Sequence, residues 1–398
     1  MGRDDESRLG HGFLPDVCPR LSHGAAQAVH FICHSARWEE CSGAGAAAAG
    51  TFGTSACSGR QETGGRVTAR RWKSKAGTRA GASCALLLLA ACSGRQSALD
   101  PAGEDAETLA LMFTVMVTAA AILWLCLNGL FFYVTRVSPR RMSRKLANGL
   151  VIGGGILMPL VLIGALLAWG LSILPDHDQP GDGLVIRVQG EQWWWRVAYE
   201  TPEGDVISAN EIRMPVGERV SFVLDSHRVI HSFWIPSLGG KMDMFPGRQT
   251  NLSLRADEAG IYRGQCAEFC GASHAWMAFE VEAMEPDAFD AWLAAEAAPA
   301  GPPDGGAEAI GRQIFAREGC GGCHEIRGTE FQGQVGPDLT HVGSRHSLGA
   351  GRLGARLEDF STWIAHTDDL KPGVEMPPFD HLPQEELTAL AAYLKGLQ

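Results

Sequence analysis

Four side chains with soft ligand atoms lie within one 12-residue stretch of the sequence. Cys266 and Cys270 supply two thiolates, His274 an imidazole and Met277 a thioether. A nitrogen and sulfur ligand set of this kind favours copper. A single-copper electron-transfer site needs only one cysteine, so the second cysteine predicts two coppers bridged by both sulfurs. A structural zinc site and a Cys266–Cys270 disulfide are the alternatives, and Met277 argues against zinc because zinc rarely binds thioethers.

A bridged copper pair needs a second imidazole from outside this stretch. His231 is the candidate, because it lies 35 residues before Cys266 in an apolar run, 229–236, that indicates a β-strand. His227 precedes this run, and we interpret it as a surface residue.

A second cofactor pattern begins 50 residues after Cys270. Cys320, Cys323 and His324 form Cys-x-x-Cys-His, in which two thiols add to the haem vinyl groups and the histidine becomes an axial ligand. Met376, 52 residues after His324, is the expected sixth ligand, because the Pro and Gly residues around it predict a shaped loop. A core methionine is the alternative. We interpret the other histidines of this region as surface or structural residues: His341, His346, His366 and His381.

Two different apolar patterns surround these candidate sites. From 181 to 285, short β-branched runs are separated by Gly, Pro and Asp, which predicts an all-β Greek-key sandwich or barrel. Residues 286–306 are rich in Ala, Pro and Gly and predict a linker. From 307 to 398 the pattern is helical, and a helix around 311–315 should pack against a last helix at 384–397. The chain is therefore predicted to be multi-domain.

The segment 105–175 is predicted to be a transmembrane hairpin. It contains two uncharged stretches, 108–134 and 149–174, each long enough to cross about 30 Å of hydrocarbon. The positive-inside rule places the connecting segment in the cytoplasm, because it carries basic residues and no acidic one: Arg136, Arg140, Arg141, Arg144 and Lys145. Both ends of the hairpin then emerge on the outer side, and everything after residue 175 is exported.

Residues 1–91 are predicted to be an N-terminal extension with a signal peptide. Basic residues precede the apolar run 84–91, which is typical of an export signal. The sequence Leu-Ala-Ala-Cys ending at Cys92 resembles the lipobox of bacterial lipoproteins, so Cys92 is a candidate lipid anchor. Because a signal peptide begins near the start codon, we interpret residues 1–66 as a misassigned translation start.

The charge balance excludes a nucleic-acid binder. The chain has 34 Lys and Arg against 45 Asp and Glu, a net charge of −11, and neither of the two predicted exported domains, 181–285 and 307–398, is net basic. Its 11 cysteines are too few and too scattered for a small disulfide scaffold.

Residues 105–285 resemble subunit II of cytochrome c oxidase. The resemblance rests on the two-helix hairpin, the His-Ser-Phe-Trp-Ile-Pro strand, the 241–248 loop and the Cys-x-Glu-x-Cys-Gly-x-x-His-x-x-Met loop. It implies a cupredoxin barrel that holds the dinuclear copper centre CuA. The implied ligands are the bridging sulfurs of Cys266 and Cys270, one imidazole per copper from His231 and His274, the weak axial ligand Met277 and the backbone carbonyl of Glu268.

The same resemblance implies two further roles and shows one departure. The Glu268 side chain would bind a magnesium ion shared with subunit I. Trp193, the first of three consecutive tryptophans, would be an exposed residue facing the electron donor, whereas Trp194 and Trp195 are interpreted as packing residues. Many family members have a glutamate of a proton-uptake channel where this chain has Ile152.

Residues 307–398 resemble class I cytochrome c. The loop Gly-Pro-Asp-Leu that begins at Gly336 is similar to one in small cytochromes c whose proline carbonyl orients the haem-binding histidine. The resemblance therefore implies that Pro337 orients His324.

Together the resemblances imply subunit II, the electron inlet, of a haem–copper oxidase in a bacterial inner membrane. Electrons would pass from a donor to haem c, to CuA and to subunit I, where oxygen is reduced to water and protons are pumped. The expected partners are subunits I and III, membrane lipid, and a cytochrome c or upstream respiratory complex as donor. The alternatives are a CuA subunit of a nitric-oxide reductase and a copper-delivery protein, the second of which leaves the haem motif unexplained.

Overall fold

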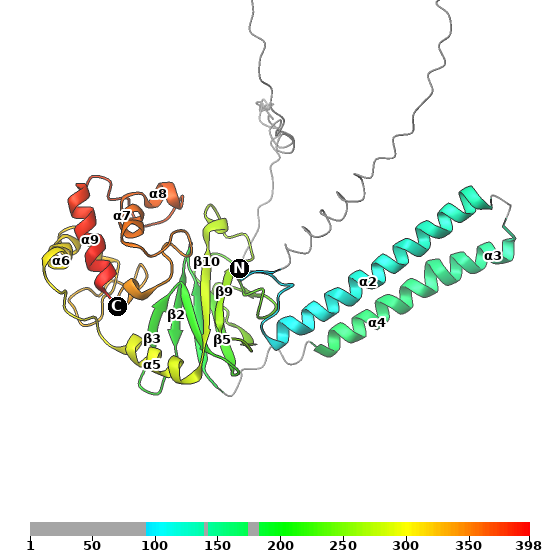
Figure 1. Ribbon diagram of the computed structural model, residues 1–398, viewed down its shortest axis with the longest axis horizontal. Helices are drawn as coiled ribbons and strands as arrows, with labels where there is room; N and C mark the ends of the chain where they lie inside the picture. The colour runs from blue at the N-terminus through cyan, green and yellow to red at the C-terminus, as the bar shows by residue number, and fades with distance from the viewer. Residues whose placement is uncertain (1–92, 139–141, 174–182) are drawn as a thin grey trace, which may run out of the picture. The chain divides into compact units, whose positions relative to one another are not determined.

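The computed structural model describes residues 93–138, 142–173 and 183–398 (Figure 1). The predicted export signal, the lipid anchor at Cys92 and the misassigned start all lie outside the described residues.

Two long apolar helical stretches, 104–137 and 144–173, have the length and composition needed to cross a bilayer. The first is α2 (Glu104–Phe132) with a π-helical end at Tyr133–Val137. The second is α3 (Arg144–Gly149), a π-helical segment at Leu150–Leu157 and α4 (Met158–Ile173). The π-helical segment ends just before Pro159, whose ring nitrogen has no hydrogen to donate to the preceding turn, so the change of helix type falls at the proline.

The predicted all-β domain is confirmed as two five-stranded sheets (Figure 1). Most pairs are antiparallel, but β1 pairs with β5, and β4 with β10, in parallel, so both sheets contain crossover connections. The first sheet has the order β3 (Val206–Ala209), β2 (Trp195–Tyr199), β1 (Val185–Gly190), β5 (Arg219–Ser226), β8 (Thr250–Arg255). The second has the order β4 (Glu211–Pro215), β10 (Ala278–Met284), β9 (Gly260–Cys266), β6 (His231–Trp234), β7 (Met242–Met244).

Aromatic rings fill the space between the sheets. Trp195, Phe233 and Phe279 are all buried, and their ring centroids lie 4.7 to 5.8 Å apart. The Phe279 ring lies directly over Gly264, where a Cβ atom would approach it to 2.1 Å, so β9 needs glycine there. Because β9 ends at Cys266, this close-packed core supports the start of the predicted metal loop.

The predicted linker at 286–306 is wrong for its first half. Residues Pro286–Ala297 form helix α5, which packs on β3 and β4. Phe289, Trp292 and Leu293 lie at helical spacing and join the core of the β domain, with the Trp292 ring 5.2 Å from that of Tyr199. The alanines that favoured a linker lie on the polar side of this amphipathic helix. Only residues 298–305 connect the two domains.

The C-terminal domain is helical, as predicted. It contains α6 (Gly306–Arg317), α7 (Leu357–Ala365), α8 (Thr367–Leu370) and α9 (Gln384–Gly396). The predicted packing of the first helix on the last is confirmed, because α6 crosses α9 closely. At the crossing a Cβ on Gly311 would lie 2.1 Å from the Ala389 carbonyl oxygen, so only glycine permits this approach.

Hydrogen bonds join the helical domain to the β domain. The buried carboxylate of Glu211 on β4 accepts bonds from the backbone N–H groups of His346 and Ser347. The Ala278 N–H at the start of β10 donates to the Ala350 carbonyl at 3.1 Å. Burial raises the pKa of Glu211, a cost that its two backbone donors partly offset.

Candidate copper and haem sites

The structure brings the two predicted cysteine ligands and the two predicted histidine ligands into one cluster. The Sγ atoms of Cys266 and Cys270 are 3.8 Å apart. His231 Nδ1 lies 3.7 Å from the Cys266 sulfur, and His274 Nδ1 lies 3.6 Å from the Cys270 sulfur. A disulfide has a sulfur–sulfur distance of about 2.05 Å, so the two cysteines are free thiols here.

Two weaker ligand atoms complete this cluster. The Met277 sulfur is 3.8 Å from the Cys270 sulfur, and the Glu268 carbonyl oxygen is 3.2 Å from the Cys266 sulfur. Glu268 itself is exposed.

The cluster is built by two paired strands and the loop that follows them. His231 begins β6 and Cys266 ends β9, and these strands pair with Phe233 opposite Cys266. The loop is fixed from the side by Gln192 Nε2 and Trp193 Nε1, which both donate to the Cys270 carbonyl, at 2.9 and 3.0 Å. The ligand atoms are thus held in place by the fold itself.

The protonation of the thiols suits a cation. Hydrogen bonding from Cys270 lowers the pKa of Cys266 to about 3, with a further contribution from His231, and the same bond raises the pKa of Cys270. Cys266 is therefore the more readily ionised thiol of the pair. Two thiolates, two imidazoles and a thioether form a donor set that fits copper.

Gly190 shapes this site and carries no ligand atom, so the sequence motif did not reveal it. A Cβ at Gly190 would lie 2.8 Å from Cδ2 and 2.9 Å from Cγ of His231. The strand β1 can lie beside the imidazole only because residue 190 has no side chain.

We expect Gly190→Ala to displace the His231 ring and to lower copper affinity by about tenfold. The same clash should destabilise the domain by roughly 1–3 kcal/mol. Copper titration and urea unfolding of the full chain measure the two effects. Gly183→Ala is the matched control, since its Cβ would meet only the Arg219 carbonyl at 3.6 Å; equal effects of both substitutions would contradict this role of Gly190.

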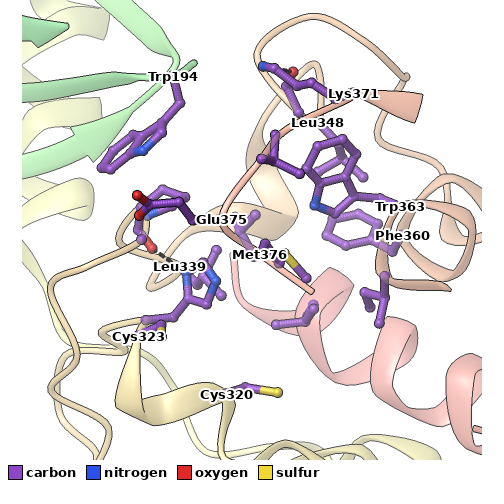
Figure 2. A pocket seen from close by; sticks show the side chains of 18 of the residues that line it. Trp194, Cys320, Cys323, Leu339, Leu348, Phe360, Trp363, Lys371, Glu375 and Met376 are labelled. Carbon is purple, nitrogen blue, oxygen red and sulfur yellow. Dashed lines mark hydrogen bonds between the residues drawn. The ribbon is translucent and has the colours of Figure 1, made fainter. Parts of the chain in front are cut away.

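The predicted haem residues line one pocket in the helical domain (Figure 2). Figure 2 shows Cys320 and Cys323 on one wall, and Met376 between them and the aromatic side chains of Phe360 and Trp363. Burial raises the pKa of the Cys320 thiol to about 11, so this sulfur stays protonated until it reacts. A mainly apolar cavity with two thiols at one wall and a thioether opposite fits a covalently bound haem.

His324 is held by the Pro337 loop as the resemblance implied. Its Nδ1 is hydrogen-bonded to the Pro337 carbonyl at 2.8 Å, which leaves Nε2 free to bind a metal. A Cβ on Gly336 would lie 2.5 Å from His324 Cε1, so glycine is needed beside the ring. Burial lowers the pKa of His324 and keeps the imidazole neutral, the form that binds iron.

The expectation of an exposed Trp193 is wrong. Its side chain is only 7% exposed, because the helical domain covers it: a Cβ on Gly373 would lie 3.1 Å from the Trp193 ring. Trp195 is in the core, as interpreted. Trp194 lies at the edge of the haem pocket, stacked 4.7 Å from the Arg196 guanidinium. The sequence places the three tryptophans in one domain, and nothing in it indicates that any of them contacts a second domain.

The other histidines have structural or surface contacts. His341 is buried and bonded to the Ala298 carbonyl, and His346 pairs with Glu282. His227 and His381 form exposed pairs with acidic residues.

Comparisons with known proteins match both domains that contain the candidate sites. The family described as "Cytochrome C oxidase subunit II, periplasmic domain" matches residues 205–284, and the family "Cytochrome c" matches residues 308–398. Cytochrome c oxidase subunit 2 of Alkalihalophilus pseudofirmus is 35% identical over 78% of this chain and 94% of its own length. The Bacillus subtilis protein of the same name is 31% identical over 78% of this chain and 95% of its own.

A solved structure of the periplasmic domain of cytochrome oxidase subunit II from Bradyrhizobium japonicum is 29% identical. It covers 30% of this chain and 96% of that one, with a TM-score of 0.28. The family assignment rests on these two relatives, of which the chain covers 94% and 95% of the length. The chain belongs to the cytochrome c oxidase subunit 2 family and ends in a cytochrome c domain.

Proposed function

We propose that this chain receives electrons at haem c, passes them to a dinuclear CuA centre and delivers them to subunit I of the oxidase. Oxygen would be reduced there and protons pumped. The observation that supports this proposal is that the two clusters of candidate ligands lie in adjoining domains, and that the β domain forms part of the lining of the candidate haem pocket. The pocket of Cys320, Cys323, His324 and Met376 is lined on one side by the β-domain residues Gln192, Trp193, Trp194 and Asn210.

The copper ligands would be Cys266 and Cys270 as bridges, His231 and His274 as single ligands, and Met277 and the Glu268 carbonyl as weak ligands. Copper supplies one-electron chemistry at this position. The chain's own part is to keep the ligand geometry constant, which it does by anchoring His231 and Cys266 on paired strands and the Cys270 carbonyl on two side-chain donors.

The haem would be attached to Cys320 and Cys323, with His324 and Met376 as axial ligands. Pro337 would orient His324 and set its tautomer through the bond at Nδ1. Trp193 would stand between the two centres, since its ring packs against Gly373 and its Nε1 donates to the Cys270 carbonyl. The electron donor of Trp193 would then be the haem domain of the same chain.

The proposed function also implies an arrangement in the membrane and a set of partners. The two apolar helices would span the inner membrane with the basic connection 136–145 in the cytoplasm and both redox domains on the periplasmic side. Subunits I and III would surround the hairpin, and a cytochrome c or an upstream complex would reduce the haem. The exposed Glu268 carboxylate would bind magnesium at the subunit I interface, and Cys92 would carry lipid.

The test is a combined absorption and paramagnetic resonance spectrum of the full chain, produced with haem-attachment machinery and copper. A haem c spectrum and one unpaired electron shared equally by two coppers are expected. A mononuclear copper signal, or firmly bound zinc, would reject the proposal for the Cys266 and Cys270 loop.

A further inference from the structure

Lys371 is a buried lysine between the two redox domains. Only 2% of its surface is exposed, and it lies five residues before Met376 on the same loop. Lysine is almost never fully buried unless its amine has partners, because removing a charge from water costs several kcal/mol. The partners of this amine therefore indicate what the residue does.

The Lys371 amine bonds to one carbonyl from each domain. Nζ donates to the Trp193 carbonyl of the β domain at 2.5 Å and to the Gly349 carbonyl of the helical domain at 2.8 Å. Burial lowers the pKa of Lys371 to about 7; the nearby Cys270 opposes this shift and the positive charge of Arg352 adds to it. A neutral amine still has two N–H groups, so both bonds persist in either protonation state.

The residues that follow Lys371 extend the same contact toward the metal loop. The Pro372 carbonyl accepts a bond from Ser273 Oγ at 2.7 Å, and Ser273 immediately precedes His274. Gly373 lies against the Trp193 ring, where its positive φ of 83° and the lack of a side chain permit the approach. Three consecutive residues of the haem loop thus contact Trp193 and the copper loop.

A role confined to the helical domain does not explain these contacts. The Gly349 bond alone would serve that domain, but the shorter bond crosses to Trp193. A methionine or leucine would fill the same volume without the cost of desolvating an amine. A directional donor is needed only if the carbonyls of both domains must be held at fixed positions.

We propose that Lys371 is a positioning residue that fastens the haem domain to the copper domain at Trp193. This inference rests on the proposed electron relay, and it identifies the residue that fixes the distance between its two centres. Without the amine, the Trp193 carbonyl loses its partner and the haem domain undocks more often.

The experiment compares Lys371→Met with Lys395→Met in the full chain carrying haem and copper. Lys395 also donates to a backbone carbonyl, that of Gly343 at 2.6 Å, but this bond lies within the haem domain. The first readout is hydrogen exchange at the amides of Ala278 and Ser347, which donate across the domain interface. The second is the rate of electron transfer from haem to copper after flash reduction of the haem.

Lys371→Met is expected to speed exchange at both amides and to slow the transfer, each at least tenfold, whereas Lys395→Met leaves both near wild type. Unchanged exchange in Lys371→Met would overturn the proposal. Lys371→Gln is a second variant, included in case Lys371→Met misfolds. Loss of Met376 ligation in both Lys371 variants would also overturn the proposal, because Lys371 would then serve the haem domain alone. If the chain gave no dinuclear copper signal, the proposed electron relay would be rejected. The hydrogen-exchange comparison would still test whether Lys371 fastens the haem domain to the copper domain.

Discussion

Replacing Cys270 by Ser is expected to abolish the shared-electron copper signal and to stop electron flow out of the haem domain. The Ser hydroxyl is a hard, neutral ligand, and it replaces the sulfur that lies 3.8 Å from Cys266, 3.6 Å from His274 and 3.8 Å from Met277. Removing this central atom breaks the link between the two halves of the site. We expect copper affinity to fall by roughly 100-fold or more.

Metal analysis and paramagnetic resonance of the full chain measure this loss. Cys126→Ser is the control, because Cys126 is an exposed cysteine on α2, far along the sequence from the copper loop. Retention of two coppers and an unaltered signal in Cys270→Ser would mean that the bridging role is wrong.

Replacing His324 by Ala is expected to remove nearly all stable haem from the chain. The imidazole would be the axial ligand beside the two cysteines that would attach the haem, and its ring is bonded to the Pro337 carbonyl and packed against Gly336. Without it, Met376 would be the one remaining candidate axial ligand of the predicted set, and the helical domain would hold the proposed haem far less firmly.

Haem staining of the denatured chain and the absorption spectrum of the native chain report this effect. His381→Ala supplies the comparison, since His381 is exposed and pairs only with the Glu318 carboxylate. If the two variants retained equal amounts of haem, another residue would have to be the axial ligand.

The clustering of the candidate ligands could be predicted from the sequence because most of each set lies in one short segment. Cys266, Cys270, His274 and Met277 share one loop, and Cys320, Cys323 and His324 share one turn, so spacing alone limits the chemistry. His231 was found through its apolar strand. The two-helix, all-β and helical segments were predictable for the same reason, since periodicity is local.

The features that sequence reasoning missed depend on contacts between distant residues. Gly190 is needed because His231 packs against it from another sheet, and glycine alone gives no signal of its neighbour. Helix α5 was hidden by its alanine-rich composition, although Phe289, Trp292 and Leu293 had helical spacing. The burial of Trp193 and the partners of Lys371 arise only when two domains meet.

The shortened connection between the domains has a consequence for the organisation of electron supply. Because α5 packs on the β domain, only residues 298–305 separate it from α6. Eight extended residues span at most about 30 Å, so a haem domain that left its docking face would remain beside its own partner domain. In the proposed relay, the haem of each chain would therefore deliver electrons to the copper centre of the same chain.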